Sequence, residues 1–124
     1  MISLCPLIII QLLIHWIADF YFQTDKMAIN KSTSMKWLTY HVLTYTGIFI
    51  ILNNYIILSN ISILFWILFN GASHWIIDFF TSKITSYFWK KEDRHNFFVT
   101  IGFDQFLHVS ILIITIPLFV KINY

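Results

Sequence analysis

Four long apolar runs constrain the fold of this chain more than any other feature of its sequence. Polar breaks separate the runs, which cover residues 2–22, 37–58, 61–82 and 98–120. A helix of about 20 residues crosses the hydrocarbon core of a bilayer, which is roughly 30 Å thick. We therefore predict an all-α fold in one domain, residues 1–124, that forms a polytopic membrane bundle of four transmembrane helices.

The composition agrees with a lipid environment. Of the 124 residues, 58% are hydrophobic and only 11% are charged. A soluble domain of this size leaves a large share of its surface exposed and has no means of covering so much apolar area. We therefore expect the lipid bilayer to be the main partner of the chain.

Basic residues gather in two of the three connections between the runs. The first connection and its flank carry Lys26, Lys31 and Lys36, the last carries Lys83, Lys90, Lys91 and Arg94, and Lys121 follows the fourth run. The positive-inside rule then places both basic loops in the cytoplasm and both termini outside, as in a bacterial inner-membrane protein. We expect no nucleic-acid partner, because these cations flank the runs and form no basic surface interleaved with aromatic residues.

A six-residue motif occurs twice along the chain. Residues 15–20 (HWIADF) and 74–79 (HWIIDF) are identical at five of six positions. Their runs are expected to point the same way, so an internal duplication of a helical hairpin, in parallel orientation, explains the repeat. Such repeats suit transporters and homo-oligomers, and chance similarity between two aromatic-rich runs is the alternative explanation.

Polar side chains recur at four-residue intervals within the apolar runs. Residues four apart share one face of a helix. The matching sets are Gln11, His15 and Asp19 in the first run, His41 and Tyr45 in the second, Asn70, His74 and Asp78 in the third, and Asp104 and His108 in the fourth. The order of Asp and His reverses in the fourth run, as an antiparallel helix requires. We expect one layer of Asp near the cytoplasmic face, with His one turn deeper.

Buried aspartates need compensation, since an ionised side chain costs about 2.5–3.5 kcal/mol at the centre of a bilayer. Pairing with His, as polar packing between helices, is one explanation. A divalent metal ion is the other, and mixed His and carboxylate shells suit Zn, Mn or Fe. We favour the metal because three pairs of Asp and His, on three different helices, are expected at matching depths in the bilayer. The predicted ligands are His15, Asp19, His74, Asp78, Asp104 and His108.

A metal-dependent hydrolase is the function that this pattern favours. Bound metal lowers the pKa of water to about 7, and a site at head-group level suits an amphiphilic lipid or phosphoester substrate. The predicted catalytic residues are Asp19, Asp78, His41 and Asp104. The predicted substrate contacts are Gln23, Asp25 and Lys26 at the mouth of the site, together with Gln105.

The polar motifs resemble those of a known family. They are H-x-x-x-D-F-x-x-Q-x-D-K at residues 15–26, H-x-x-x-Y at 41–45, S-H-x-x-x-D-F at 73–79 and D-Q-x-x-H at 104–108. In combination they resemble an uncharacterised family of small bacterial and phage membrane proteins, the domain of unknown function 3307. That family is distantly similar to membrane-embedded proteins described as metal-dependent hydrolases. The resemblance covers nearly the whole chain and implies no established activity.

Two other functions compete with hydrolysis. Transport of a metal ion or proton is one, because intramembrane His and Asp residues form ion pathways. The other is a structural or accessory membrane protein whose polar layer specifies helix packing.

Overall fold

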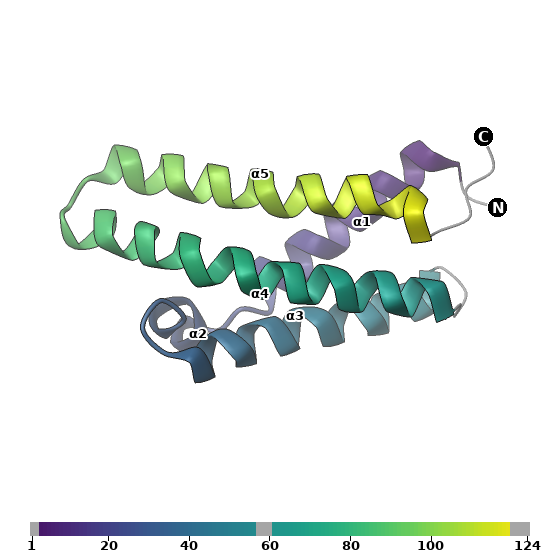
Figure 1. Ribbon diagram of the computed structural model, residues 1–124, viewed down its shortest axis with the longest axis horizontal. Coiled ribbons are helices and arrows are strands. Elements are labelled where there is room, and N and C mark those ends of the chain that lie inside the picture. Colours follow the sequence, from purple (N-terminus) through teal and green to yellow (C-terminus); the bar gives the residue numbers. More distant parts are fainter. Residues whose placement is uncertain (1–2, 57–60, 120–124) are drawn as a thin grey trace.

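The chain forms an all-α bundle, as expected. The computed structural model describes residues 3–56 and 61–119 (Figure 1). Helix α1 covers Leu4–Trp16 and continues directly as a π-helix, η1, over Ile17–Tyr21. A short helix α2 (Asp25–Asn30) follows, and then three long helices, α3 (Met35–Ile56), α4 (Ile61–Lys90) and α5 (Arg94–Phe119).

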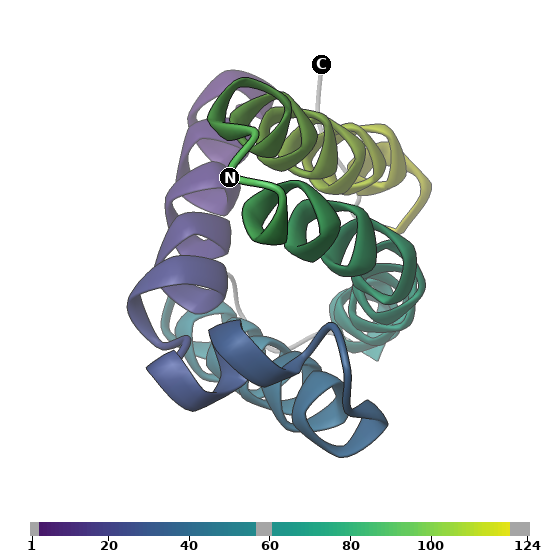
Figure 2. The ribbon, with the colours of Figure 1, turned by 90° about the vertical axis from the view of Figure 1, so that its left-hand side faces the viewer.

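Helices α3, α4 and α5 lie side by side in alternating directions, whereas α1 crosses them obliquely (Figure 1). Helix α4 contacts both α3 and α5. Helix α2 lies across one end of the bundle, close to the start of α3, and the connection from α4 to α5 is at this same end (Figures 1 and 2). We call this the α2 end. The first turn of α1 and the last turn of α5 lie at the opposite end.

Three stretches of the described chain are long and apolar enough to cross a membrane. They are Leu4–Tyr21, Ile61–Lys90 and Arg94–Phe119, with mean hydropathies of 1.7, 1.4 and 1.8. These stretches suggest an integral membrane protein, but they do not confirm four spans, because the more polar helix α3 is not among them. The predicted run ends at residues 2, 58 and 120 lie outside the described residues.

The apolar core fills the half of the bundle away from the α2 end. Its buried side chains include Leu7, Phe49, Trp66 and Ile116. Among the described residues, three side-chain hydrogen bonds between helices cross this core, one of them from Asn70 Nδ2 to Thr115 Oγ1 at 3.2 Å. Gln11 Nε2 donates to Asn53 Oδ1 at 2.7 Å, and Trp66 Nε1 donates to Thr115 Oγ1 at 2.8 Å. Gln11 and Asn70, the amide residues predicted on the same helix faces as His and Asp, therefore link helices within the apolar core.

Helices α4 and α5 extend beyond the predicted spans at the α2 end. Lys83 and Lys90 are helical, so the basic connection is reduced to residues 91–93. Helix α4 meets no proline or glycine after Gly71, and its continued backbone hydrogen bonding outweighs the polarity of its last turns. The chain then turns at Glu92, whose φ is 58°.

Asp93 caps the start of α5. Its carboxylate accepts hydrogen bonds from the backbone N–H of Asn96 at 3.1 Å and from the side-chain amide of Asn96 at 2.7 Å. These bonds hold the pKa of Asp93 below its ordinary value, because they favour the ionised carboxylate. The cap explains why α5 begins at Arg94, directly after the turn.

The first apolar stretch, Leu4–Tyr21, is not a continuous α-helix. Its sequence did not predict this interruption. At Ile17–Tyr21 the helix widens, and the N–H of Phe22 donates to the carbonyl of Ile17, five residues back, at 3.1 Å. Such π-segments are rare and frequently mark functional sites. The matching residues 76–80 of α4 stay α-helical. The two copies of the repeat therefore differ in backbone geometry around their Asp residues.

Candidate metal centre

Histidines and aspartates from four parts of the chain meet inside the bundle. Asp19 comes from η1, His41 from α3, His74 and Asp78 from α4, and His108 from α5. None of these five residues is more than 5% exposed. The polar faces predicted from four-residue spacing thus face one common interior.

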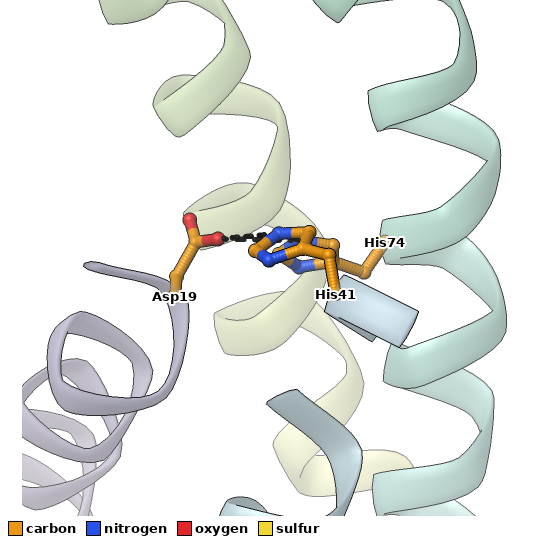
Figure 3. A group of neighbouring side chains, drawn as sticks. All are labelled: Asp19, His41 and His74. Carbon is orange, nitrogen blue, oxygen red and sulfur yellow. Dashed lines mark hydrogen bonds and ion pairs between the residues drawn. The ribbon is translucent and has the colours of Figure 1, made fainter. Parts of the chain in front are cut away.

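Three ligand-type atoms form a triangle at this point. Asp19 Oδ1 lies 3.1 Å from His41 Nε2 and 3.3 Å from His74 Nε2, and the two Nε2 atoms are 3.2 Å apart (Figure 3). Zinc bonds of about 2.0–2.2 Å in a tetrahedral shell separate neighbouring ligand atoms by roughly 3.3–3.6 Å. The triangle is therefore close to the size of one face of a metal shell, and these residues could hold one ion.

Asp78 adjoins the triangle through one carboxylate oxygen. Its Oδ2 atom lies 3.2 Å from His41 Nε2 and 3.6 Å from His74 Nε2. Its Oδ1 atom faces the other way, 3.2 Å from His108 Nε2. His74, Asp78 and His108 form a second group able to hold an ion. Because both groups contain His74, they overlap in one centre.

Lys31 enters this centre from the connection between α2 and α3. Its ammonium nitrogen lies 2.9 Å from Asp78 Oδ2, and its side chain is only 18% exposed. Burial alone lowers the pKa of Lys31, but the carboxylates of Asp78 and Asp19 outweigh burial and raise the pKa above its ordinary value. Lys31 therefore remains a cation.

Sequence reasoning missed this role and treated Lys31 only as a loop cation. No local pattern signals it, because the contact depends on how α2 folds back over the end of the bundle. The remaining signal is its place in one of the two long polar connections between apolar runs.

His15 lies beside the triangle and belongs to neither group among the described residues. Its Nδ1 atom is 3.0 Å from the hydroxyl of Tyr45, and its Nε2 atom is 3.0 Å from Gln105 Oε1. The amide of Gln105 in turn donates to Asp19 Oδ2 at 2.9 Å and to Asp104 Oδ2 at 3.1 Å. His15 and Gln105 thus orient carboxylates of the centre from outside it.

Asp104 also stands outside both groups. It accepts a hydrogen bond from Thr81 Oγ1 at 2.5 Å, and its Oδ1 atom is 3.3 Å from His108 Nε2. Its side chain is 14% exposed, more than the other two aspartates. Asp104 therefore connects the buried centre to the space beside it.

A cavity of about 460 Å³ opens next to the centre, toward the α2 end. Asp19, Asp78, Asp104 and Lys31 line its inner part, and Gln23 and Gln105 line it as well. Asp25 and Lys26, the other predicted substrate contacts, are exposed on α2 and are not among the lining residues. Their predicted role has no support from this placement.

The charges of the centre do not balance without a further cation. Asp19, Asp78 and Asp104 carry three negative charges and Lys31 carries one positive charge, which leaves a formal charge of −2. Two protonated imidazoles or one divalent ion would neutralise it. The Nε2 atoms of His41 and His74 lie 3.1–3.6 Å from carboxylate oxygens of Asp19 and Asp78, so these contacts suit either way of neutralising the centre.

These features define a class of small all-α proteins with candidate membrane helices and a buried His and Asp group that could hold a metal. The chain belongs to the family described as protein of unknown function (DUF3307), whose model matches residues 7–123. This match confirms the family resemblance of the polar motifs. No curated protein and no solved structure matches the chain, and the comparisons do not show the similarity to metal-dependent hydrolases.

Proposed function

We propose that this protein is a membrane-embedded, metal-dependent hydrolase that acts on an amphiphilic lipid or phosphoester substrate. The observation that carries this proposal is the triangle of Asp19 Oδ1, His41 Nε2 and His74 Nε2, with sides of 3.1–3.3 Å, beside a cavity of about 460 Å³. A ligand cluster and an adjoining space for a substrate are the two parts that metal-assisted hydrolysis requires.

Asp19, His41, His74 and Asp78 are the proposed ligands of one Zn, Mn or Fe ion, and His108 supports Asp78. A divalent ion supplies water of lowered pKa and polarises the oxygen of the scissile group. In hydrolysis the water oxygen bonds to the phosphorus or acyl carbon, the ester bond breaks, and a water proton passes to the leaving oxygen. Asp104 is the proposed base because it lines the cavity outside the ligand groups. We assign His41 to the ligands and not to this base role.

A topology of four spans is part of the proposal, with the α2 end in the cytoplasm and both termini outside. Helix α3 is relatively polar, but its His41, Tyr45 and Asn53 side chains are buried, whereas Leu43 and Ile51 are more than half exposed. Its outward face is therefore apolar and suited to lipid. The cations at the α2 end agree with the positive-inside rule.

Transport through the bundle has less support than hydrolysis. Residues 3–14, 46–56, 61–73 and 109–119, which form the half away from the α2 end, contain no Asp, Glu, Lys, Arg or His. Buried apolar side chains such as Leu7, Phe49 and Leu112 fill that half. An ion leaving the centre in this direction would meet no charged or imidazole partner in the described chain.

Elemental analysis of the protein purified in detergent tests the metal centre. We expect about one divalent ion per chain, and we expect Asp19→Asn or His74→Gln to remove most of it. Asp25→Asn and His95→Gln are matched controls, because both native side chains are exposed and belong to neither ligand group. Wild-type protein that holds no divalent ion, or ligand variants that keep full metal content, would overturn the proposal.

Hydrolysis is then measured on metal-loaded protein with a panel of fluorescent ester and phosphoester amphiphiles. We expect turnover that a chelator abolishes and that the divalent ion restores. Asp104→Asn should lose turnover while its metal content stays at the wild-type level. A metal-loaded protein that cleaves none of these substrates would favour a structural role for the centre.

A further inference from the structure

We propose that the cavity is a binding site for the phosphate head group of an amphiphile, with its apolar chain leaving along the cavity wall. This inference rests on the proposed function in treating that amphiphile as the substrate. It names the chemical class of the substrate and the residues that bind it, which the metal centre alone does not decide.

One side of the cavity is rich in hydrogen-bond donors. Helix α4 lines it with consecutive turns of hydroxyl and ammonium groups, and Lys31 lines it from the α2–α3 connection. The lining residues of α4 with such groups are Thr81, Ser82, Thr85, Ser86 and Lys90. The hydroxyls of Thr81 and Thr85 already donate to Asp104 and to the Thr81 carbonyl, so the donors proposed for a ligand are Ser82, Ser86 and Lys90. Phosphate offers several acceptor oxygens, and hydrogen bonds from a cation to such oxygens are among the strongest in proteins.

Two buried polar atoms of this cavity lack a hydrogen-bond partner in the described chain. They are the hydroxyl oxygen of Ser82 and the side-chain oxygen of Gln23. Ser82 is only 9% exposed. Buried polar groups are nearly always hydrogen-bonded, so these two unpaired oxygen atoms indicate a place where a ligand binds. A phosphate oxygen would accept from Ser82, and a hydroxyl of the head group, such as that of a glycerol, would donate to Gln23.

Apolar side chains form another part of the cavity wall, which is open at the surface. Phe20, Ile29, Trp89 and Phe97 line it, and the first three are 42%, 73% and 59% exposed. A volume of about 460 Å³ lies within the usual range for small-molecule sites, roughly 300–1,000 Å³. A head group fits inside it, and an acyl chain would pass over these side chains toward lipid.

The charge balance of the cavity connects this site to the metal. Lys31 and Lys90 contribute +2 and the three lining aspartates −3, a formal sum of −1 for the charged lining residues. A divalent ion changes this sum to +1. Because an anion is repelled in the first case and attracted in the second, we expect the ion to strengthen binding of the phosphate.

Calorimetric titration of manganese-loaded protein in a non-ionic detergent tests this inference. The probes are dihexanoyl phosphatidate, dihexanoylglycerol, glycerol 3-phosphate and inorganic phosphate. We expect phosphatidate to bind best, since it alone has both a phosphate and apolar chains. Ser82→Ala and Lys90→Met should each weaken its binding by about tenfold, which is the effect of losing one hydrogen bond to a charged group.

Ser73→Ala and Lys83→Met are the matched controls, because Ser73 is half-buried and Lys83 is exposed, and neither side chain lines the cavity. Equal binding of phosphatidate and dihexanoylglycerol, or unchanged binding in the Ser82→Ala and Lys90→Met variants, would overturn the head-group site. Stronger binding of inorganic phosphate than of phosphatidate would overturn the role of the apolar wall.

Metal content measured on the same samples separates the two proposals. Metal-loaded protein that does not bind phosphatidate overturns the head-group site and leaves the hydrolase proposal standing. Protein that never holds metal, yet binds phosphatidate through Ser82 and Lys90, overturns the hydrolase proposal and supports the head-group site.

Discussion

The ammonium nitrogen of Lys31 lies 2.9 Å from Asp78 Oδ2, although the two residues are 47 positions apart in the chain. The same carboxylate oxygen lies 3.2 Å from His41 Nε2, where it adjoins the ligand triangle. An ammonium ion and a metal ion would therefore compete for one oxygen. This contact links the connection that carries α2 to the chemistry of the proposed centre.

We predict that Lys31→Met increases the affinity of the centre for a divalent ion by about tenfold or more. A hydrogen bond between charged groups contributes about 1.5–3 kcal/mol, and each 1.4 kcal/mol corresponds to a factor of ten. Metal titration of chelator-treated protein measures the change. Lys26→Met is the control, because Lys26 is exposed on α2. Equal metal affinity in Lys31→Met and wild type would show that the ammonium does not compete.

The pH dependence of the Lys31 contact follows from its raised pKa. A group whose pKa is raised on folding contributes stability that is complete below its unfolded pKa, about 10.4, and that is lost as the pH rises through the folded pKa. The difference in unfolding free energy between wild type and Lys31→Met in metal-free protein should thus stay constant from about pH 7 to 9. Chemical denaturation at several pH values measures it, and a difference that already falls across this range would contradict a raised pKa.

We predict that Gly71→Ala destabilises the contact between α3 and α4. A Cβ atom added at Gly71 would overlap Thr46 Oγ1, and the β-branched Thr46 is restricted to two common rotamers in a helix. Overpacking of this kind costs about 1–3 kcal/mol. Gly47→Ala and Gly102→Ala are the controls, because an added Cβ meets nothing within 4 Å there.

In these controls the loss of a helical glycine should stabilise the protein by about 0.5–1 kcal/mol. Thermal unfolding in detergent compares the three variants. A Gly71→Ala protein as stable as the controls would show that α3 and α4 are not in close contact at this position.

Gln11 and Asn53 should show coupled effects on stability, because Gln11 Nε2 donates to Asn53 Oδ1 at 2.7 Å in the core. We expect a coupling energy of about 0.6–2 kcal/mol between Gln11→Leu and Asn53→Leu, the range found for hydrogen bonds between membrane helices. A double-mutant cycle of unfolding free energies measures it. Strict additivity would contradict the hydrogen bond.

Cysteine labelling distinguishes four spans from three. In a Cys5→Ser background, we expect Ser3→Cys to react with an impermeant maleimide on intact cells. Lys91→Cys should react only after the membrane is permeabilised, because four spans place the α4–α5 connection in the cytoplasm. If α3 does not cross the bilayer, the chain is inside after the first span and α4 crosses to the outside. The α4–α5 connection then lies outside, and Lys91→Cys becomes reactive on intact cells. That result would overturn the four-span topology.

Local periodicity was sufficient to predict much of this protein. The apolar runs predicted the long helices, and four-residue spacing predicted that Asp19, His41, His74 and Asp78 share one interior. These predictions succeed because the repeat of an α-helix depends on neighbouring residues alone. The assignment of His15 as a ligand has no comparable support, since both its ring nitrogens contact Tyr45 and Gln105. Spacing predicts the face of a side chain but not its partner.

From the sequence by itself come the helical class, the family and the inward direction of the His and Asp side chains, because all three depend on residue identity and short-range spacing. Only the tertiary structure decides which oxygen of Asp78 faces Lys31, where η1 widens the first span, and which side chains enclose the cavity. Those features depend on the tilt and packing of helices that are far apart in the chain. A tilt that moves one side chain by an ångström is enough to make or remove a ligand contact.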